Sequence, residues 1–305
     1  MKRAGPRNVS ASVLARLLAL SKKSGDDYNV LLTAYVFERF LFRLGISEVR
    51  DRFVLKGAML LRVWSDHPYR STRDLDLLRR GDASDAAIRE DIVVVCSTPV
   101  DADGLLFDTD SMELAPIRPD EKYAGTRVTM TAYCGNARIP MQIDVGVGDA
   151  VYPRPVLTEY ATLLEMPAPR VVAYAAETVI AEKVEAMVVL GMRNSRIRDF
   201  FDVWYLAQNF PFERQMLTGA IAETFKRRGT PIPEDDPIAL TPEYWRDPAR
   251  EPHIRAFVRR ARLEATPERG VELLDVLRPF LIPLLDDVRR GVKEEGTWLP
   301  GGPWS

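Results

Sequence analysis

The chain has 305 residues, of which 46% are apolar and 28% charged, and its formal net charge is −2. This composition is typical of a globular protein, and the length allows one large domain or two smaller ones. No apolar run approaches the roughly 18 residues of a membrane-spanning helix, and no signal peptide is recognisable, so we expect a cytoplasmic protein without membrane contact. With only two histidines and two cysteines, neither a zinc site nor histidine-based catalysis is expected.

The first half of the chain is predicted to form a small mixed sheet flanked by helices. Helices are expected over residues 10–23, 26–44 and 59–64, and strands over 53–56, 74–78, 105–117, 127–133 and 138–147. Residues 84–97 fit a helix, although 92–96 could instead be a strand. Turn signals at Ala124-Gly125 and Gly135-Asn136 separate the last three strands, as in an antiparallel meander.

After four prolines between residues 153 and 169 the pattern becomes almost entirely helical. Helical segments are expected over residues 175–190, 197–209, 212–228, 241–265 and 271–291. The sequence therefore predicts an α/β domain over 1–155 and a helical domain over 156–305, which completes the active-site cleft. The tail that carries Trp298 and Trp304 is expected to pack on the protein body, because exposed tryptophan is costly.

The most informative residues are Asp74 and Asp76, which lie in an apolar run. In an extended strand both carboxylates point to one face, about 7 Å apart, and they repel each other unless a cation lies between them. Mg²⁺ prefers such hard oxygen ligands, often together with substrate phosphates. A solvated strand edge would explain the same pattern, but the leucines around the pair indicate partial burial, where an unpaired carboxylate is costly. Gly57, at the end of the preceding strand, allows a close backbone approach to a ligand.

Basic residues gather in several short segments despite the slightly negative net charge. Such groups are usually solvated faces, but groups that converge on one cleft would bind phosphates. The main groups are Arg62, Arg70, Arg73, Arg79 and Arg80; Arg193, Arg196 and Arg198; Lys226, Arg227 and Arg228; and Arg255, Arg259, Arg260 and Arg262.

Three blocks, in their order and spacing, resemble the AbiEii/MenT-like nucleotidyltransferase toxins of bacterial toxin–antitoxin and phage-defence systems. The blocks are residues 53–58 with 70–77, residues 142–145, and residues 177–186 followed by 198–204. The resemblance runs from about residue 30 to residue 210, and the tryptophan-rich end is also similar. It implies an α+β fold, with a polymerase-β-like nucleotidyltransferase core and a C-terminal helical domain.

By this resemblance, Asp74 and Asp76 bind Mg²⁺ (or Mn²⁺), and Asp144 is a third carboxylate that ligates a second ion or acts as a general base. Gly57 corresponds to a glycine-rich turn near the phosphates. Here Ala58 follows it, where the family often has serine or glycine, so a hydroxyl contact to phosphate from this position is missing. Ser71 and Thr72 lie where related toxins have a hydroxyl that contacts phosphate or becomes modified.

Lys183 is the most informative residue of the third block. The resemblance implies that it binds the triphosphate, whereas spacing alone would also fit a helix lysine that extends along the surface. Asp199 and Asp202 share one helix face and could pair with Lys183 or with Arg198. We favour Asp199 as the catalytic carboxylate and place Asp202 with the nucleotide-binding residues.

The sequence thus predicts a Mg²⁺-dependent toxin that transfers a nucleoside monophosphate from an NTP to RNA, at the 3′ end of tRNA, and so blocks translation. Arg73, Arg193, Arg196 and Arg198 are expected to contact the RNA, and a cognate antitoxin is expected as a partner. Two alternatives stay open at this point: transfer to a small molecule or a protein hydroxyl, and a non-catalytic NTP-binding module that binds an antitoxin.

Overall fold

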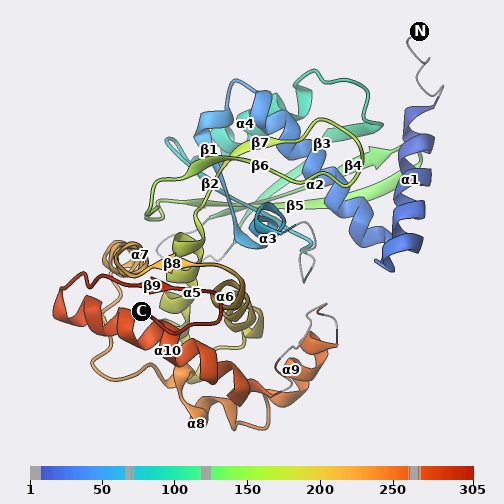
Figure 1. Ribbon diagram of the computed structural model, residues 1–305. Helices are drawn as coiled ribbons and strands as arrows, with labels where there is room; N and C mark the ends of the chain where they lie inside the picture. Colours follow the sequence, from blue (N-terminus) through green and yellow to red (C-terminus); the bar gives the residue numbers. More distant parts are fainter. Residues whose placement is uncertain are drawn as a thin grey trace. The chain divides into compact units, whose positions relative to one another are not determined.

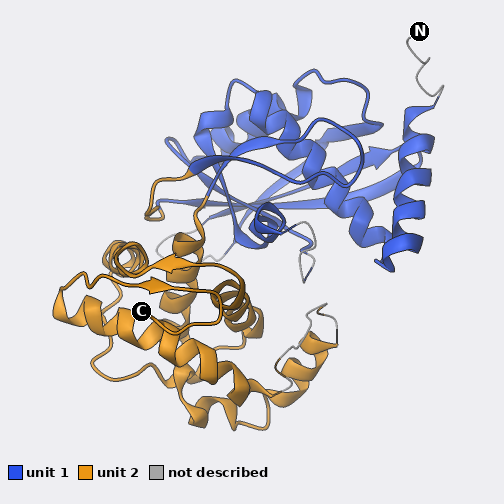
Figure 2. Ribbon diagram, viewed as in Figure 1, with its two compact units in different colours: residues 1–148, 156–173 blue, residues 149–155, 174–305 orange. Residues whose placement is uncertain are grey.

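The computed structural model describes residues 8–65, 70, 72–117, 125–259, 261, 267 and 269–305. The chain forms two compact units (Figure 2): unit 1 comprises residues 1–148 and 156–173, and unit 2 comprises residues 149–155 and 174–305. The sequence placed the boundary at residue 155. The structure assigns residues 156–173 to unit 1, because two short strands in this segment join its sheet.

Unit 1 is built on a mixed seven-stranded sheet with the strand order β3-β4-β5-β2-β1-β7-β6 (Figure 1). Strand β1 is antiparallel to β2 and parallel to β7, β2 is parallel to β5, and the other neighbours are antiparallel. The strands are β1 (Phe53–Lys56), β2 (Leu75–Arg79), β3 (Leu105–Pro116), β4 (Thr126–Cys134), β5 (Ala137–Val147), β6 (Val156–Glu159) and β7 (Arg170–Ala173).

The three longest helices of unit 1 begin at side chains that cap their first turns. Asn8, Asp27 and Ser84 each accept a hydrogen bond from a backbone N–H of the helix that follows. The cap at Ser84 begins a helix that continues to Ser97, so residues 92–96 are helical and not a strand. The helices are α1 (Val9–Ser24), α2 (Tyr28–Ile46), α3 (Leu61–Trp64) and α4 (Asp85–Ser97), with 3₁₀ turns η1 (Arg50–Arg52) and η2 (Gly57–Leu60).

The sheet of unit 1 has an apolar face and a polar face. Leu55, Leu77 and Val145 lie opposite one another on neighbouring strands and are at most 1% exposed. Helix α2 packs against β5 and β7, and α4 packs against β3. Because side chains alternate along a strand, the neighbouring residues Lys56, Asp76 and Asp144 point to the opposite face, which we call the polar face although it also carries the buried Val54 and Leu78. That face carries the candidate site described below.

Unit 2 is mainly helical. Helix α10 packs against α6 and α7, and α5 packs against α7. Its helices are α5 (Ala176–Leu190), α6 (Ile197–Asn209), α7 (Arg214–Arg228), α8 (Pro242–Trp245), α9 (Glu251–Val258) and α10 (Gly270–Arg290), with 3₁₀ turns η3 (Gly191–Arg193) and η4 (Ile238–Leu240) and strands β8 (Phe212–Glu213) and β9 (Thr297–Trp298). The predicted α+β class, a mixed sheet with flanking helices and a helical second part, is confirmed.

Two predicted helices differ from the structure, and two strands were not predicted. The helix expected over 241–265 is two short helices, α8 and α9, because Pro248 cannot continue a helix and Asp247 caps the turn at the N–H of Ala249. The helix expected from residue 212 begins at Arg214, since Phe212 pairs with Trp298 in strands β8 and β9. Strands β6 and β7 lie in the proline-rich segment before the first predicted helix of the second half, where the sequence predicted no element; β7 pairs with the distant strand β1.

The tryptophan-rich tail packs on unit 2, as predicted. Trp298 is 1% exposed, and its indole N–H donates to the Ala207 carbonyl at 2.7 Å. The indole N–H of Trp304 donates to the Phe280 carbonyl at 3.0 Å, and the two rings stack with centroids 5.7 Å apart. Among the helices that the structure describes, none combines the length and the apolar sequence needed to cross a bilayer.

A buried carboxyl group lies in the core of unit 1. Glu38 of α2 is fully buried; its Oε2 accepts from the Leu163 N–H at 2.6 Å, and its Oε1 lies 3.1 Å from Nη2 of Arg39. Burial raises the pKa of Glu38 to about 7, although Arg39, the Leu163 N–H and Arg62 all favour the charged form. Glu38 therefore binds its proton more tightly in the folded chain than in the unfolded one.

We expect the free energy of unfolding to fall as the pH rises through this interval. In the unfolded chain Glu38 loses its proton near pH 4.5, whereas in the folded chain it does so near pH 7. Between these values the folded state binds more protons, so stability decreases with pH, by up to about 3 kcal/mol from this residue. Urea unfolding from pH 4.5 to 7.5 measures this slope. Glu38→Gln should flatten it, and equal slopes in the two proteins would contradict the assignment.

Candidate active site

One level of the sheet in unit 1 brings four charged residues side by side. The strand register pairs Lys56 with Asp76, Asp76 with Asp144, and Asp144 with Arg127. Directly opposite residues on neighbouring strands point to the same face. These four residues, which we call the charged row, therefore lie together on the polar face, and two of the predicted site carboxylates, Asp76 and Asp144, are direct neighbours.

Asp74 lies immediately before β2 and is oriented by its own loop. Its Oδ1 accepts a hydrogen bond from the Thr72 hydroxyl at 2.8 Å and one from the Arg73 N–H at 3.3 Å. The Thr72 hydroxyl, predicted to contact nucleotide, thus positions a candidate metal ligand in this structure. Ser71, predicted for the same role, lies outside the described residues.

Two independent features require a glycine at position 57: its own backbone angle and the closeness of the Asp76 side chain. Its φ is +71°, in the left-handed region that favours glycine. A Cβ at this position would lie 2.0 Å from Oδ2 of Asp76, far inside contact distance. Gly57 therefore leaves room for the Asp76 carboxylate. This is a more specific reason for a glycine at this position than the closeness to phosphates that the resemblance implied.

Arg127 of β4 binds Asp144 with a two-pronged ion pair. Its Nε lies 2.8 Å from Oδ1 and its Nη2 lies 2.7 Å from Oδ2, while Nε2 of Gln142 donates to Oδ1 at 3.3 Å. The pKa of Arg127 is raised, first by this hydrogen bonding and then by the charges of Asp144, Asp74 and Asp76, against the lowering effect of burial. All three carboxylates therefore act on one guanidinium. Sequence reasoning did not single out Arg127.

The polar face offers two of the three predicted carboxylate ligands to a divalent cation. Asp76 on β2 and Asp74 in the loop just before it supply hard oxygen ligands, and the charges of both act on Arg127. Mg²⁺ commonly binds through one or two carboxylates plus substrate phosphates. Within the described ranges, no three His, Cys, Asp or Glu side chains are gathered so that they could hold one ion. The predicted third ligand, Asp144, instead binds Arg127. The residues thus fit a site of two carboxylates, with Asp144 adjacent but engaged.

Unit 2 contains a second charged group, formed by Lys183 of α5 with Asp199 and Asp202 of α6. The Lys183 ammonium lies 2.7 Å from Oδ2 of Asp202 and also donates to Oδ1 of Asp199. The side chains are only 15%, 4% and 19% exposed for Lys183, Asp202 and Asp199, so the lysine does not extend along the surface. Both carboxylates pair with Lys183, where the sequence had left the choice between them open.

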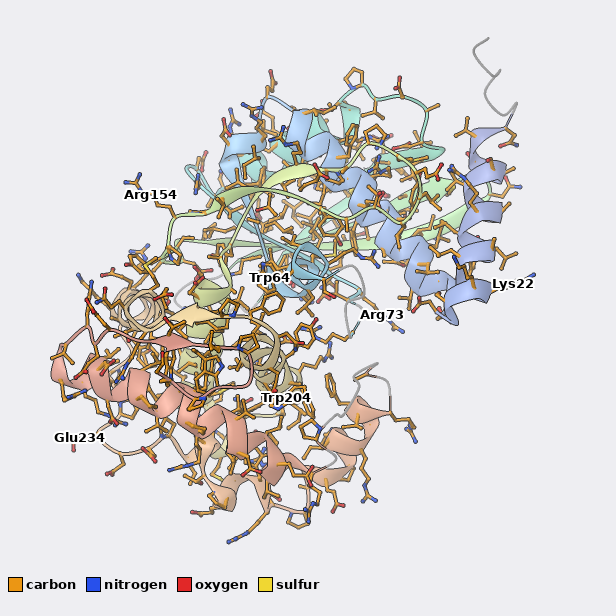
Figure 3. All side chains as sticks on the ribbon, in the orientation of Figure 1. Lys22, Trp64, Arg73, Arg154, Trp204 and Glu234 are labelled. Carbon is orange, nitrogen blue, oxygen red and sulfur yellow. The ribbon has the colours of Figure 1, made fainter. Side chains whose placement is uncertain are left out.

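The arginines predicted to contact RNA differ in exposure. Arg73 of unit 1 is exposed and lies just before Asp74 (Figure 3). In unit 2, Arg193 and Arg198 are exposed and Arg196 is half-buried, around η3 and the first turn of α6. These residues are available for contact with a polyanion, each on its own unit.

These features define an α+β protein with acidic residues on the polar face of a mixed sheet. The model of the family described as "Nucleotidyl transferase AbiEii toxin, Type IV TA system" matches residues 39–278. The chain therefore belongs to the AbiEii nucleotidyltransferase toxin family. It is a nucleotidyltransferase, and the family implies an NTP substrate and an antitoxin partner.

Two solved structures from Helicobacter pylori are similar at low identity. One, described as a candidate nucleotidyltransferase, is 12% identical with a TM-score of 0.43 over 88% of this chain and 97% of its own. The other, JHP933, is 13% identical with a TM-score of 0.43 over 87% of this chain and 94% of its own. No curated protein matches the chain significantly.

Proposed function

We propose that the protein uses Mg²⁺ and an NTP to transfer a nucleoside monophosphate to the 3′ end of tRNA, which blocks translation. The observation that carries the proposal is the charged row, in which Asp76 and Asp144 lie side by side on a sheet face next to Gly57, in a chain of a nucleotidyltransferase family. A cytoplasmic location, where tRNA is available, stays a prediction.

Asp74 and Asp76 are the residues that would hold the metal. A bound Mg²⁺ supplies charge neutralisation at the phosphates and lowers the pKa of an attacking hydroxyl. The protein's own contribution is to hold the ligands in place: Thr72 orients Asp74, and Gly57 leaves space for Asp76. Such preorganised ligands do not have to rearrange during the reaction, which is the main source of electrostatic catalysis.

Lys183 is the residue of unit 2 that we propose to bind the triphosphate. Asp199 and Asp202 hold its ammonium from two sides. Asp202 is the more buried of the two and serves as the anchor, while Lys183 can exchange the more exposed Asp199 for the triphosphate and so free this carboxylate. Asp199 is therefore the better candidate for a direct role in catalysis, and Asp202 for a positioning role.

Labelling with α-³²P-NTPs tests the proposed function. The full chain is incubated with Mg²⁺, each labelled NTP in turn, and total RNA or purified tRNA. Label at the tRNA 3′ end supports the proposal, and periodate-oxidised tRNA, which lacks the 3′ diol, should accept none. Label only in a small molecule or a protein would assign another acceptor, and NTP binding without any transfer would assign a non-catalytic role.

The exposed arginines of unit 2 give a separate prediction about the acceptor. A double charge reversal, Arg193→Glu with Arg198→Glu, should weaken tRNA binding about tenfold or more at low salt, because phosphate contacts supply most of the sequence-independent affinity. The slope of log K against log salt should fall by about one for each phosphate that the variant no longer binds. Filter binding at several salt concentrations measures both quantities. Arg246→Glu, at another exposed arginine of unit 2, is the matched control for Arg198→Glu alone, and an equal weakening of tRNA binding in these two proteins would contradict the placement.

A further inference from the structure

The ion pair between Arg127 and Asp144 engages both oxygens of the third carboxylate. Oδ1 accepts from Nε of Arg127 and from Nε2 of Gln142, and Oδ2 accepts from Nη2 of Arg127. The Asp144 side chain is 13% exposed, so water competes little for these oxygens. A bidentate guanidinium pair of this kind is among the strongest side-chain interactions.

The position of Arg127 also bears on the other two carboxylates. The charges of Asp74 and Asp76 both act on its guanidinium. A cation that binds to Asp74 and Asp76 therefore meets a positive charge nearby, which repels it. The Arg127 guanidinium thus occupies Asp144 and repels a cation that would bind to Asp74 and Asp76.

We propose that Arg127 is a positioning residue that acts as an internal counter-ion and holds Asp144 out of the metal site while no nucleotide is bound. The inference rests on the proposed function, which assigns the metal site to Asp74 and Asp76, and adds Asp144 as a third ligand once Arg127 releases it. Arg127 has to release Asp144 before this carboxylate can ligate a metal ion. The triphosphate of the nucleotide is the natural alternative partner, because guanidinium forms the same bidentate pairs with phosphate as with carboxylate. Metal and nucleotide binding are then coupled through one arginine.

Titration of the nucleotide-free full chain with Mn²⁺, followed by electron paramagnetic resonance, tests this role without any need for transfer activity. Arg127→Gln should raise the affinity for Mn²⁺ about tenfold, since it frees Asp144 and removes a nearby positive charge. Arg138→Gln changes an exposed arginine on the neighbouring strand β5 and should leave the affinity unchanged. An unchanged or weaker affinity in Arg127→Gln would overturn the proposal.

A double-mutant cycle separates release of Asp144 from simple charge repulsion. In an Asp144→Asn background the carboxylate is already missing, so Arg127→Gln should raise the affinity by no more than about threefold, from repulsion alone. An equal gain in both backgrounds would show that Asp144 is not a ligand and would overturn the proposal. The neutral pair of this double variant also leaves no unpaired charge, which favours a folded protein.

Arg127→Lys serves as a second variant should Arg127→Gln fail to fold. Lysine keeps the charge but loses the two-pronged geometry, so its hold on Asp144 is weaker and we expect about threefold tighter Mn²⁺ binding. No change would count against the proposal. The two hypotheses fail separately: Mn²⁺ affinities as expected, with no acceptor labelled, would reject the proposed transfer alone. Transfer with unchanged Mn²⁺ affinity in Arg127→Gln would reject only the role of Arg127.

Discussion

Asp76→Asn is expected to lower nucleotide transfer by about three orders of magnitude, because a bound metal supplies several kcal/mol of transition-state stabilisation and about 1.4 kcal/mol corresponds to a tenfold change in rate. Asp76 is the central residue of the charged row, between Lys56 and Asp144. Asparagine has the same shape and fits the space that Gly57 leaves, so the variant should stay folded. The rate of label transfer to the acceptor at saturating NTP measures the effect.

The control for this variant is Asp110→Asn, which changes an exposed carboxylate on β3 of the same sheet. It should leave the transfer rate within about twofold, since a surface substitution away from the site has little effect. Asp74→Ala should also inactivate the protein, through loss of the other proposed ligand. Transfer by Asp76→Asn within tenfold of the unsubstituted protein would exclude the polar face as the active site.

Gly57→Ala is expected to reduce both stability and transfer. The left-handed backbone costs a non-glycine residue about 1–2 kcal/mol, and the added methyl group would lie 2.0 Å from Oδ2 of Asp76. Relief of such a clash typically costs a further ~1–3 kcal/mol, and here it displaces the Asp76 carboxylate. We therefore expect the free energy of unfolding to fall by about 2–5 kcal/mol in urea titrations, together with a loss of transfer comparable to that of Asp76→Asn.

Gly81→Ala is the matched control for the clash at Gly57. Gly81 has a similar φ of +83°, but no atom lies within 4 Å of a Cβ at this position. Its substitution carries the backbone strain alone and should cost only about 1–2 kcal/mol, with transfer unaffected. If both alanine variants lose the same stability and the same activity, the contact between Gly57 and Asp76 has no special role.

The candidate site was only partly predictable from the sequence. Asp74 and Asp76 stood out because two carboxylates at a spacing of two share a strand face, and Asp144 because it lies between apolar residues of a strand. Arg127 was missed, although a signal was present. The two-residue turn at Gly135-Asn136 sets the register of β4 and β5, and counting back from it pairs Arg127 with Asp144.

The failures in the fold have two causes. Strands β6 and β7 are short; β6 pairs with β7, and β7 joins the sheet through a distant strand, with Ala173 pairing with Leu55. Strands this short show too little alternation of apolar and polar residues for the sequence pattern to predict them. The break between α8 and α9, by contrast, is local, and Pro248 could have predicted it.

The sequence by itself determined the helices, the main strands, the carboxylate residues and the lysine of the third block, because hydrophobic periodicity and turn chemistry act over a few residues. Only the tertiary structure decided which charges meet. Strand register placed Asp76 beside Asp144 and gave Asp144 to Arg127, and helix packing placed Lys183 between Asp199 and Asp202. These partners lie 16 or more residues apart in the chain, so hydrophobic burial, which aligns the strands and helices, selects them.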